Sequence, residues 1–246
     1  MGTWENLNID GHACEVFLPE EPSPFGDTLI YLHDVHLKGL RGRAAFEGAF
    51  SQFGLRVLAP FTGHSWWSDK LCTEFDQNRT AESYLIDCIV PWIATHGEAQ
   101  PAQIGLLGIG MGGQGGLRLS FKYPDLFPHV AAITPAIDYQ ECWNNENYLL
   151  AQMYANPEAV RQDTATLHIH PLYWPRNIWF CSDPLDLIWS ESAQRLSMKL
   201  SALGIPYQAD LEMKPKKTDE DYEEQMALPA VEFLVERLEQ ARRTVR

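Results

Sequence analysis

The chain has 246 residues, 45% hydrophobic and 21% charged, which is typical of a soluble α/β domain with one large core. Its net charge of −14 repels phosphate backbones and anionic lipids, and this argues against nucleic-acid and membrane binding. The five cysteines include no C-x-x-C pair and the N-terminus has no leader pattern, so we expect a cytoplasmic protein with reduced thiols and a single domain over 1–246.

The first third of the chain predicts three strands and a helix. Strands are expected over 13–18, 28–32 and 55–59, and a helix over 40–53 that Gly54 closes. The second of these strands has the pattern of a buried strand and leads directly into His33 and Asp34. The loop that follows the third strand carries Trp66 and Trp67.

The rest of the chain alternates helices with strands. Helices are expected from Thr80 to Ile93 with a kink at Pro91, over 117–122, from a Ser190 cap to Leu203, and through 228–238. Strands are expected over 104–107, 130–134, 177–181 and 207–213. Residues 136–170 lack strand signals and predict a helical insertion or lid above the sheet. This alternation predicts an α/β fold with a mostly parallel sheet covered by helices on both faces.

The segment 104–122 has the strand, glycine-rich turn and helix of a nucleophile elbow. In that motif, G-x-S-x-G, a serine stands on the sharp turn at the carboxyl edge of the sheet. Here the turn is Gly108-Ile109-Gly110-Met111-Gly112, so Gly110 stands at the position of the serine. Because the backbone of this motif is strained at that residue, we expect a positive φ at Gly110.

The sequence resembles the α/β-hydrolase superfamily, and within it the esterase family that contains S-formylglutathione hydrolase (esterase D) and the mycolyltransferases. The resemblance extends from about Thr28 to the end of the chain. It is carried by the stretches 31–34 (YLHD), 108–116, 121–127 (FKYPDLF), 182–186 (SDPLD) and 199–206. It implies an α/β-hydrolase fold and a triad of serine, acid and histidine, with no cofactor.

Carried over position by position, the resemblance leaves two triad positions vacant. The nucleophile falls on Gly110, the acid on Asp183 with Asp186 as the alternative, and the histidine on Thr218. Glycine has no attacking atom, threonine takes no proton near neutral pH, and no histidine follows His170. We therefore predict a family member without hydrolytic activity.

The remaining site residues concern the oxyanion hole and a pocket. The resemblance implies oxyanion donors at the backbone of Met111 and in the loop at Asp34 or Val35. Three tryptophans either line a pocket above the elbow or belong to the core, namely Trp66, Trp67 and Trp143.

Two further patterns indicate cofactor or metal sites only weakly. Residues 108–113 match the dinucleotide pattern G-x-G-x-x-G, but they lie mid-chain rather than after the first strand. His168 and His170 alternate as metal ligands do, but no third ligand is evident, and we expect no metal site.

Several side chains near the expected site have a structural explanation as well as a functional one. Asp183 and Asp186 can cap the helix that follows them, and His33 is expected to serve as a structural hydrogen-bonding residue. Ser65 and Cys72 have no neighbouring base in the sequence, so neither is expected to replace the serine.

Three functions remain open at the level of sequence. The first is a non-hydrolytic protein that binds a small molecule in the pocket or acts by assembly. The second is an active carboxylesterase, thioesterase or acyltransferase with another nucleophile and base. The third is a purely structural role, for example as a homo-oligomer. In that case side chains fill the pocket.

Overall fold

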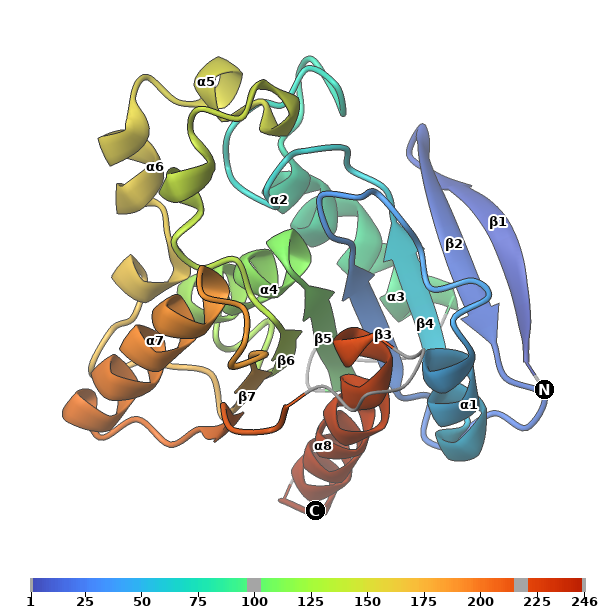
Figure 1. Cartoon of the computed structure of the whole chain (residues 1–246). Helices are drawn as coiled ribbons and strands as arrows, with labels where there is room; N and C mark the ends of the chain where they lie inside the picture. Colours follow the sequence, from blue (N-terminus) through green and yellow to red (C-terminus); the bar gives the residue numbers. More distant parts are fainter. Residues whose placement is uncertain (1, 97–102, 215–220, 245–246) are drawn as a thin grey trace.

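The computed structural model of the chain describes residues 2–96, 103–214 and 221–244, and its centre is an eight-stranded sheet (Figure 1). The strands in chain order are β1 (Thr3–Ile9), β2 (His12–Leu18), β3 (Thr28–Leu32), β4 (Arg56–Pro60), β5 (Ile104–Ile109), β6 (His129–Ile133), β7 (Asn177–Cys181) and β8 (Gln208–Asp210). Their spatial order is β1-β2-β4-β3-β5-β6-β7-β8. β2 is antiparallel to β1 and β4, and every other pair is parallel, which confirms the predicted sheet.

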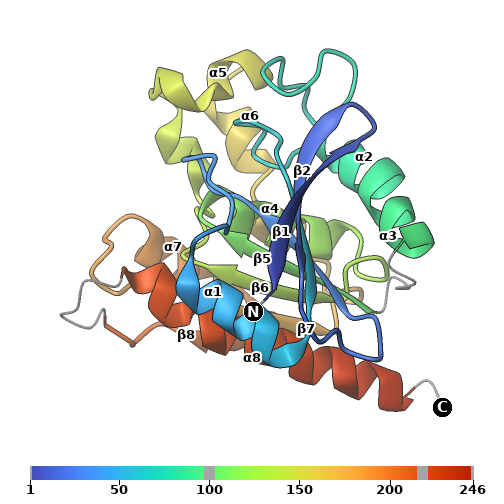
Figure 2. The same ribbon diagram turned by 90° about the vertical axis from the view of Figure 1, so that its right-hand side faces the viewer.

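Helices cover both faces of this sheet (Figures 1 and 2). One face carries α1 (Ala44–Phe53) and α8 (Tyr222–Thr244), and the other carries α2 (Ala81–Tyr84), α3 (Val90–His96), α4 (Met111–Lys122) and α7 (Trp189–Leu203). Successive residues of β3 alternate between the two cores, with Leu29 in the core under α1 and α8 and Ile30 in the other. Because both faces are buried, the central strands are continuous apolar runs.

Three helix boundaries form at the predicted signals. Gly54 closes α1 in the left-handed conformation, with φ 63°. Thr80 caps α2, because its hydroxyl accepts a hydrogen bond from Ser83 N at 3.1 Å. The expected kink at Pro91 takes the form of a π-helical segment, Leu85–Ile89, directly before α3. Proline has no N–H to continue the α-helical pattern, so the helix widens before it.

The strand prediction differs from the structure at both edges of the sheet. β1 was not predicted, because most of its side chains are exposed or half-buried and leave no apolar alternation. The last strand was expected over 207–213 but ends at Asp210. The Asp210 side chain accepts hydrogen bonds from the N–H groups of Glu212 and Met213, and this turn replaces strand pairing.

Between β6 and β7 the chain forms a group of short helices beyond the carboxyl ends of the strands (Figure 1). They are η3 (Tyr139–Cys142), η4 (Glu146–Tyr148), α5 (Leu150–Met153), α6 (Pro157–Gln162) and η5 (Ala165–Leu167). Tyr139, Leu150 and Val160 from these helices are buried in the core that also contains α4. The segment expected as an insertion therefore packs onto the body of the protein.

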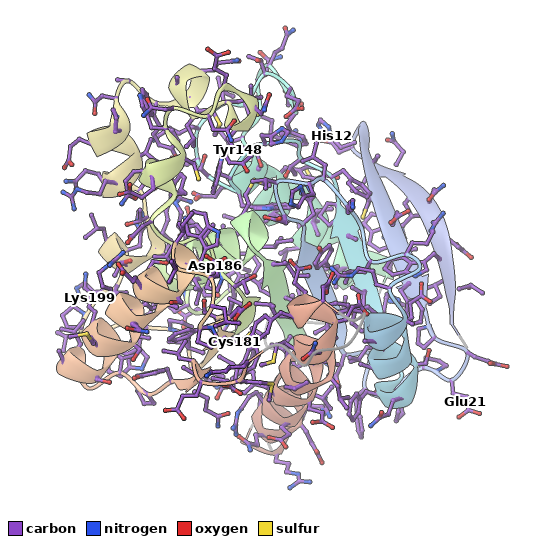
Figure 3. All side chains as sticks on the ribbon, in the orientation of Figure 1. His12, Glu21, Tyr148, Cys181, Asp186 and Lys199 are labelled. Atoms are coloured by element: carbon purple, nitrogen blue, oxygen red, sulfur yellow. The ribbon has the colours of Figure 1, made fainter. Side chains whose placement is uncertain are left out.

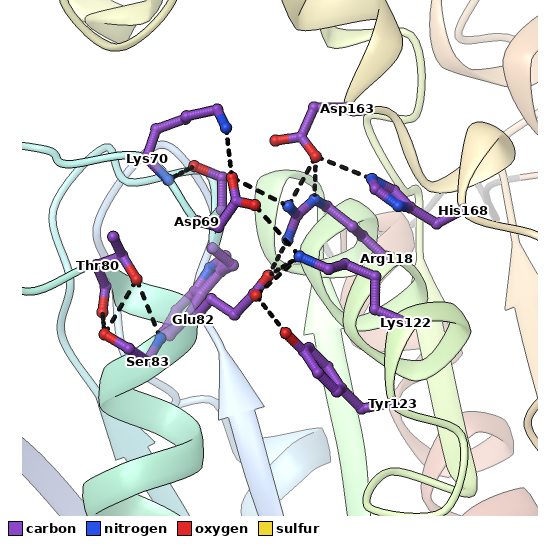
Figure 4. Close-up of polar contacts among 12 residues, drawn as sticks. Asp69, Lys70, Thr80, Glu82, Ser83, Arg118, Lys122, Tyr123, Asp163 and His168 are labelled. Carbon is purple, nitrogen blue, oxygen red and sulfur yellow. Dashed lines mark hydrogen bonds and ion pairs between the residues drawn. The ribbon is translucent and has the colours of Figure 1, made fainter.

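A buried group of charges joins this insertion to helix α4, as Figure 4 shows. Arg118 of α4 has no exposed surface, and its guanidinium binds Glu82 of α2 and lies 2.7 Å from Asp163 of the insertion. Lys122 lies 2.8 Å from Glu82, and His168 Nε2 lies 2.9 Å from Asp163 Oδ1. Burial raises the pKa of Asp163, but the His168 hydrogen bond and the Arg118 charge outweigh burial and lower the pKa to about 2.

Candidate functional site

The turn between β5 and α4 has the backbone of a nucleophile elbow. Gly110 adopts φ 53° and ψ −113°, which confirms the predicted positive φ. Its N–H donates to Ile133 O at 3.0 Å, and its carbonyl accepts from Ala136 N at 3.0 Å. Gly112 brings α4 close to β3, since a Cβ built on it would lie 1.9 Å from Leu32 O. The glycines therefore permit both the turn and its close packing.

The carboxylate of Asp34 occupies the space beside Gly110. Asp34 Oδ1 accepts a hydrogen bond from Met111 N at 2.9 Å. A Cβ built on Gly110 would lie 2.1 Å from the same oxygen, far inside van der Waals contact. The backbone donor expected at Asp34 or Val35 stays a prediction. The Asp34 side chain is an acceptor, and it occupies the expected donor at Met111.

His33 fixes the turn that carries Asp34. Its Nε2 accepts from Thr62 N at 3.1 Å, which leaves its Nδ1–H to donate to Asp34 O at 2.9 Å. The indole of Trp67 donates to His33 O at 3.1 Å. Burial lowers the pKa of His33 to about 4, so the ring is neutral near pH 7. The structural role expected for His33 is confirmed by these contacts.

Asp183 and Asp186 both line the pocket above Gly110, and both also hold backbone amides. Asp183 Oδ1 accepts from Leu185 N at 2.8 Å. Asp186 Oδ1 accepts from Ile188 N at 3.0 Å and Trp189 N at 3.1 Å, at the start of α7. The expectation that Ser190 caps this helix is wrong, because Asp186 takes that role.

Thr218, the expected position of the histidine, lies outside the described residues. Among the described residues, no hydrogen bond joins a histidine to Asp183 or Asp186, and His36 is the histidine that lines the pocket. His36 is exposed, and its Nε2 lies 3.8 Å from Asp34 Oδ2. The described part of the site therefore contains an elbow and two acids without a base between them.

The three predicted pocket tryptophans separate into different environments. Trp66 lines the pocket, stacks on Tyr139 with ring centroids 4.7 Å apart, and donates to Tyr148 O at 3.0 Å. Trp67 is completely buried, and Trp143 packs at the edge of the core. Neither lines the pocket, so for these two the core alternative holds. Trp66 and Trp67 have φ values of 53° and 52°, which is strained backbone for such side chains.

The pocket above Gly110 has a volume of about 360 Å³. Val35 lines it as expected, and its carbonyl accepts from His64 Nε2 at 3.0 Å. Sequence reasoning missed Tyr148, which comes from the insertion, and Trp189, which opens α7. Figure 3 labels Tyr148 of the insertion and Asp186 of the loop before α7, which both line this pocket. Only the fold brings Tyr148 and Trp189 to the pocket, so the sequence carried no signal for these two residues.

The start of α8 forms another wall of the pocket through Asp221, Tyr222 and Glu223. Arg43 neutralises part of this wall, at 3.5 Å from Asp221 and 2.9 Å from Glu223. Burial raises the pKa of Glu223 despite the Arg43 charge. A larger pocket of about 640 Å³ adjoins this wall and shares Asp34 with the first.

Three serine and cysteine side chains of the described residues that could act as nucleophiles are buried or protonated, namely Ser65, Cys72 and Cys142. Ser65 is completely buried, donates to Thr62 Oγ1 at 2.9 Å and accepts from Trp67 N at 3.2 Å. Burial raises the pKa of the Cys72 thiol. Cys142 lines the pocket, but burial raises its pKa to about 11, so its thiol is protonated at neutral pH.

Two general properties of the described residues limit the chemistry further. They contain no group of three or more histidine, cysteine, aspartate or glutamate side chains arranged to hold a metal ion. Over the same residues, no helix has both the length and the apolar character needed to cross a bilayer.

A family model connects this geometry with known proteins. The family described as "Putative esterase" matches residues 49–202, more than half of the chain, including Gly110 and Asp183. The curated diacylglycerol acyltransferase/mycolyltransferase Ag85C of Mycobacterium avium is 26% identical over 132 residues. That match covers 48% of this chain and 36% of the mycobacterial protein, so the chain spans only about a third of its relative.

Solved structures resemble the chain over almost its whole length. An S-formylglutathione hydrolase from Agrobacterium tumefaciens has a TM-score of 0.75 at 16% identity, covering 97% of this chain and 95% of that one. The fluorophosphonate-binding serine hydrolase F of Staphylococcus aureus has a TM-score of 0.72 at 16% identity, covering 95% and 98%. At this level of identity, the likeness establishes the fold and leaves the activity open.

Proposed function

Because the chain belongs to this esterase family and has the α/β-hydrolase fold, we propose that it is a member without serine-hydrolase activity whose pocket binds a small molecule. The observation that carries this proposal is the position of Asp34. Its carboxylate lies where the side chain of a nucleophile at position 110 would stand, and it accepts the hydrogen bond of Met111 N. One side chain therefore blocks two parts of the hydrolytic site.

The chemistry of ester hydrolysis explains why this contact matters. Attack on an ester needs a nucleophile, and the negative charge that develops on the carbonyl oxygen needs backbone N–H donors. Gly110 supplies no attacking atom, and the donor at Met111 is already bound to a carboxylate. A developing oxyanion would approach the charge of Asp34, which opposes the reaction instead of assisting it.

The remaining pocket is suited to binding. Its volume of about 360 Å³ lies within the range of small-molecule sites, and it is lined by both aromatic side chains and carboxylates. The alternative of an active esterase with another nucleophile has no support from Ser65, Cys72 or Cys142, which are buried or protonated as described. Binding without hydrolysis is the function that these features favour.

Covalent labelling with a fluorophosphonate probe, together with hydrolysis of p-nitrophenyl butyrate, tests the proposal. We expect no labelling and no turnover above the buffer rate for the natural chain. Labelling of the folded protein, or turnover that disappears when it is unfolded, would contradict the proposed loss of activity.

Variants that restore the triad residues provide a second test, in which activity is expected to appear. Gly110→Ser with Thr218→His replaces the vacant triad positions but leaves the Asp34 carboxylate in contact with the new side chain. Adding Asp34→Ala removes that contact and frees the N–H of Met111. We expect labelling in the triple variant and little in the double variant. Equal labelling in both would exclude Asp34 as the blocking group.

A further inference from the structure

Three carboxylates of the elbow pocket are not neutralised within the described residues. Asp34, Asp183 and Asp186 each use Oδ1 to accept backbone N–H groups. No lysine or arginine of the described chain lies within ion-pair distance of any of them, and His36 comes no closer than 3.8 Å to Asp34 Oδ2. Among the described residues, no hydrogen bond reaches the second oxygen of any of these carboxylates.

The walls of the pocket add a second preference for positive charge. Four aromatic side chains line it, namely Trp66, Tyr148, Trp189 and Tyr222. The rings of Trp66 and Tyr148 meet edge to face with centroids 6.0 Å apart. Aromatic faces attract cations through their quadrupole, and carboxylates nearby strengthen that attraction in a partly enclosed pocket.

The Tyr222 hydroxyl is an independent sign of a missing polar partner. Tyr222 is only 7% exposed and lines the pocket, yet its hydroxyl forms no hydrogen bond with a nitrogen or oxygen of the described residues. Its polar neighbour there is the thiol of Cys181. Buried hydroxyls normally have a nitrogen or oxygen partner, so this one is left with a weak partner at the wall of the pocket.

The rim of the pocket is apolar and exposed. Leu185, Leu187 and Ile188 are 64%, 80% and 60% exposed, and they belong to the segment 183–189 whose residues Asp183, Asp186 and Trp189 line the pocket. Apolar side chains beside a cleft favour a ligand with an apolar body next to its charged group. Carboxylates inside and apolar side chains at the rim together describe an amphiphilic cation.

We propose, resting on the binding role above, that the elbow pocket takes a small organic amine. Its ammonium group faces Asp34, Asp183 and Asp186, and its apolar part contacts Trp66, Tyr148 and the leucine-rich rim. Carboxylates and acyl esters with anionic groups are excluded by the same charges. In this proposal, the loop with Asp183 and Asp186, which corresponds to the loop of the triad acid in the esterase family, recognises a cation.

Three probes of similar shape test this preference by isothermal titration: benzylamine, which is protonated at pH 7, benzyl alcohol and benzoate. We expect saturable binding of benzylamine at least tenfold tighter than benzyl alcohol, and no binding of benzoate. The affinity for benzylamine should fall as salt is added. Absence of benzylamine binding, equal affinity for the alcohol, or tighter binding of benzoate would overturn the proposal.

Matched variants locate the binding site. Asp183→Asn and Asp186→Asn keep an oxygen for the backbone amides and remove only the charge, so the loop keeps its hydrogen bonds. Each should weaken benzylamine binding about fivefold, as expected for a partly exposed ion pair. Asp76→Asn is the control, because Asp76 also caps backbone N–H groups but lies outside the pocket. Equal affinity in all three variants would overturn the proposal.

The binding readout is independent of the hydrolysis readout. Esterase turnover with tight binding of benzylamine would contradict the proposed function and leave the ligand class intact. No turnover and no preference for the amine would contradict the ligand class and leave the loss of hydrolysis intact. Each of the two proposals can therefore be contradicted without contradicting the other.

Discussion

Two groups of carboxylates in this protein differ in how their charge is balanced. Around Arg118, the side chains of Glu82 and Asp163 are buried and bound by a guanidinium (Figure 4). Around Gly110, Asp34 and Asp183 accept hydrogen bonds only from backbone amides among the described residues, and they face a pocket. The two groups adjoin the same helix, since Gly110 directly precedes α4 and Arg118 lies within it.

The difference separates a stabilising role from a binding role. A carboxylate taken out of water needs a charged partner, because desolvation otherwise costs several kcal/mol. The carboxylates around Arg118 have that partner and hold the insertion against α4. The carboxylates around Gly110 keep contact with the pocket and remain free to meet a cation. Mutations that remove a charge should therefore affect stability in one region and ligand binding in the other.

The largest effect is expected from Arg118→Met, which leaves Glu82 and Asp163 buried without their cation. Breaking a buried pair in this way costs about 3–5 kcal/mol of unfolding free energy. Urea denaturation followed by circular dichroism measures the loss. Arg195→Met is the control, because Arg195 pairs with Asp138 at the surface, where such a pair is worth no more than about 1 kcal/mol. Similar losses in both variants would contradict the distinction between the two regions.

The sequence was sufficient for the frame of this fold because its signals are local. Gly54, Thr80 and Pro91 each impose a backbone geometry by themselves. The buried strands can be recognised in the sequence as apolar runs. The polar edge strand β1 gave no such pattern. The strand β8 was overestimated because a side-chain turn at Asp210 ends it, and strand propensity does not reveal that turn.

The site was predicted only as far as the motif reaches. The elbow at Gly110 and the acid loop at Asp183 were found from the sequence, since both follow strands within a few residues. No role was predicted for the side chain of Asp34, yet it reaches the elbow from the loop after β3, 77 residues before Met111. Tyr148 reaches the pocket only through the fold of the insertion. Contacts of this range depend on packing, which sequence periodicity does not encode.

Acid should weaken the elbow region before it weakens the Arg118 region. The pKa of His33 is lowered to about 4 from an ordinary value of 6.5, so the stabilisation by its neutral ring is complete above pH 6.5 and is lost as pH falls toward 4. A shift of that size corresponds to about 3 kcal/mol. Asp163, with a pKa of about 2, loses its stabilisation only below pH 3.8.

Unfolding free energies at pH 7.5, 5.5 and 4.5 measure this order. The natural chain should lose stability steadily across the series, and His33→Gln should start less stable and show a flatter slope. Asp163→Asn should keep the slope of the natural chain between pH 7.5 and 4.5, because its group does not titrate there. A slope unchanged by His33→Gln would assign the acid sensitivity to another group.

The smallest of the three effects concerns Gly110 itself and isolates the contact with Asp34. Gly110→Ala should cost about 2 kcal/mol, because alanine is strained at φ 53° and its Cβ meets Asp34 Oδ1. Gly204→Ala is the matched control: Gly204 has φ 68° with no atom near its Cβ position, and about 1 kcal/mol is expected from strain alone.

A double-mutant cycle then decides the origin of the difference. In an Asp34→Ala background, the cost of Gly110→Ala should fall to that of Gly204→Ala, because only the backbone strain remains. Thermal or urea unfolding of the four proteins gives the coupling free energy, expected at about 1 kcal/mol. A coupling near zero would mean that the Asp34 carboxylate moves aside at no cost. In that case the blocked elbow would be one conformation among several, and the double variant Gly110→Ser with Thr218→His would suffice to restore labelling without any change at Asp34.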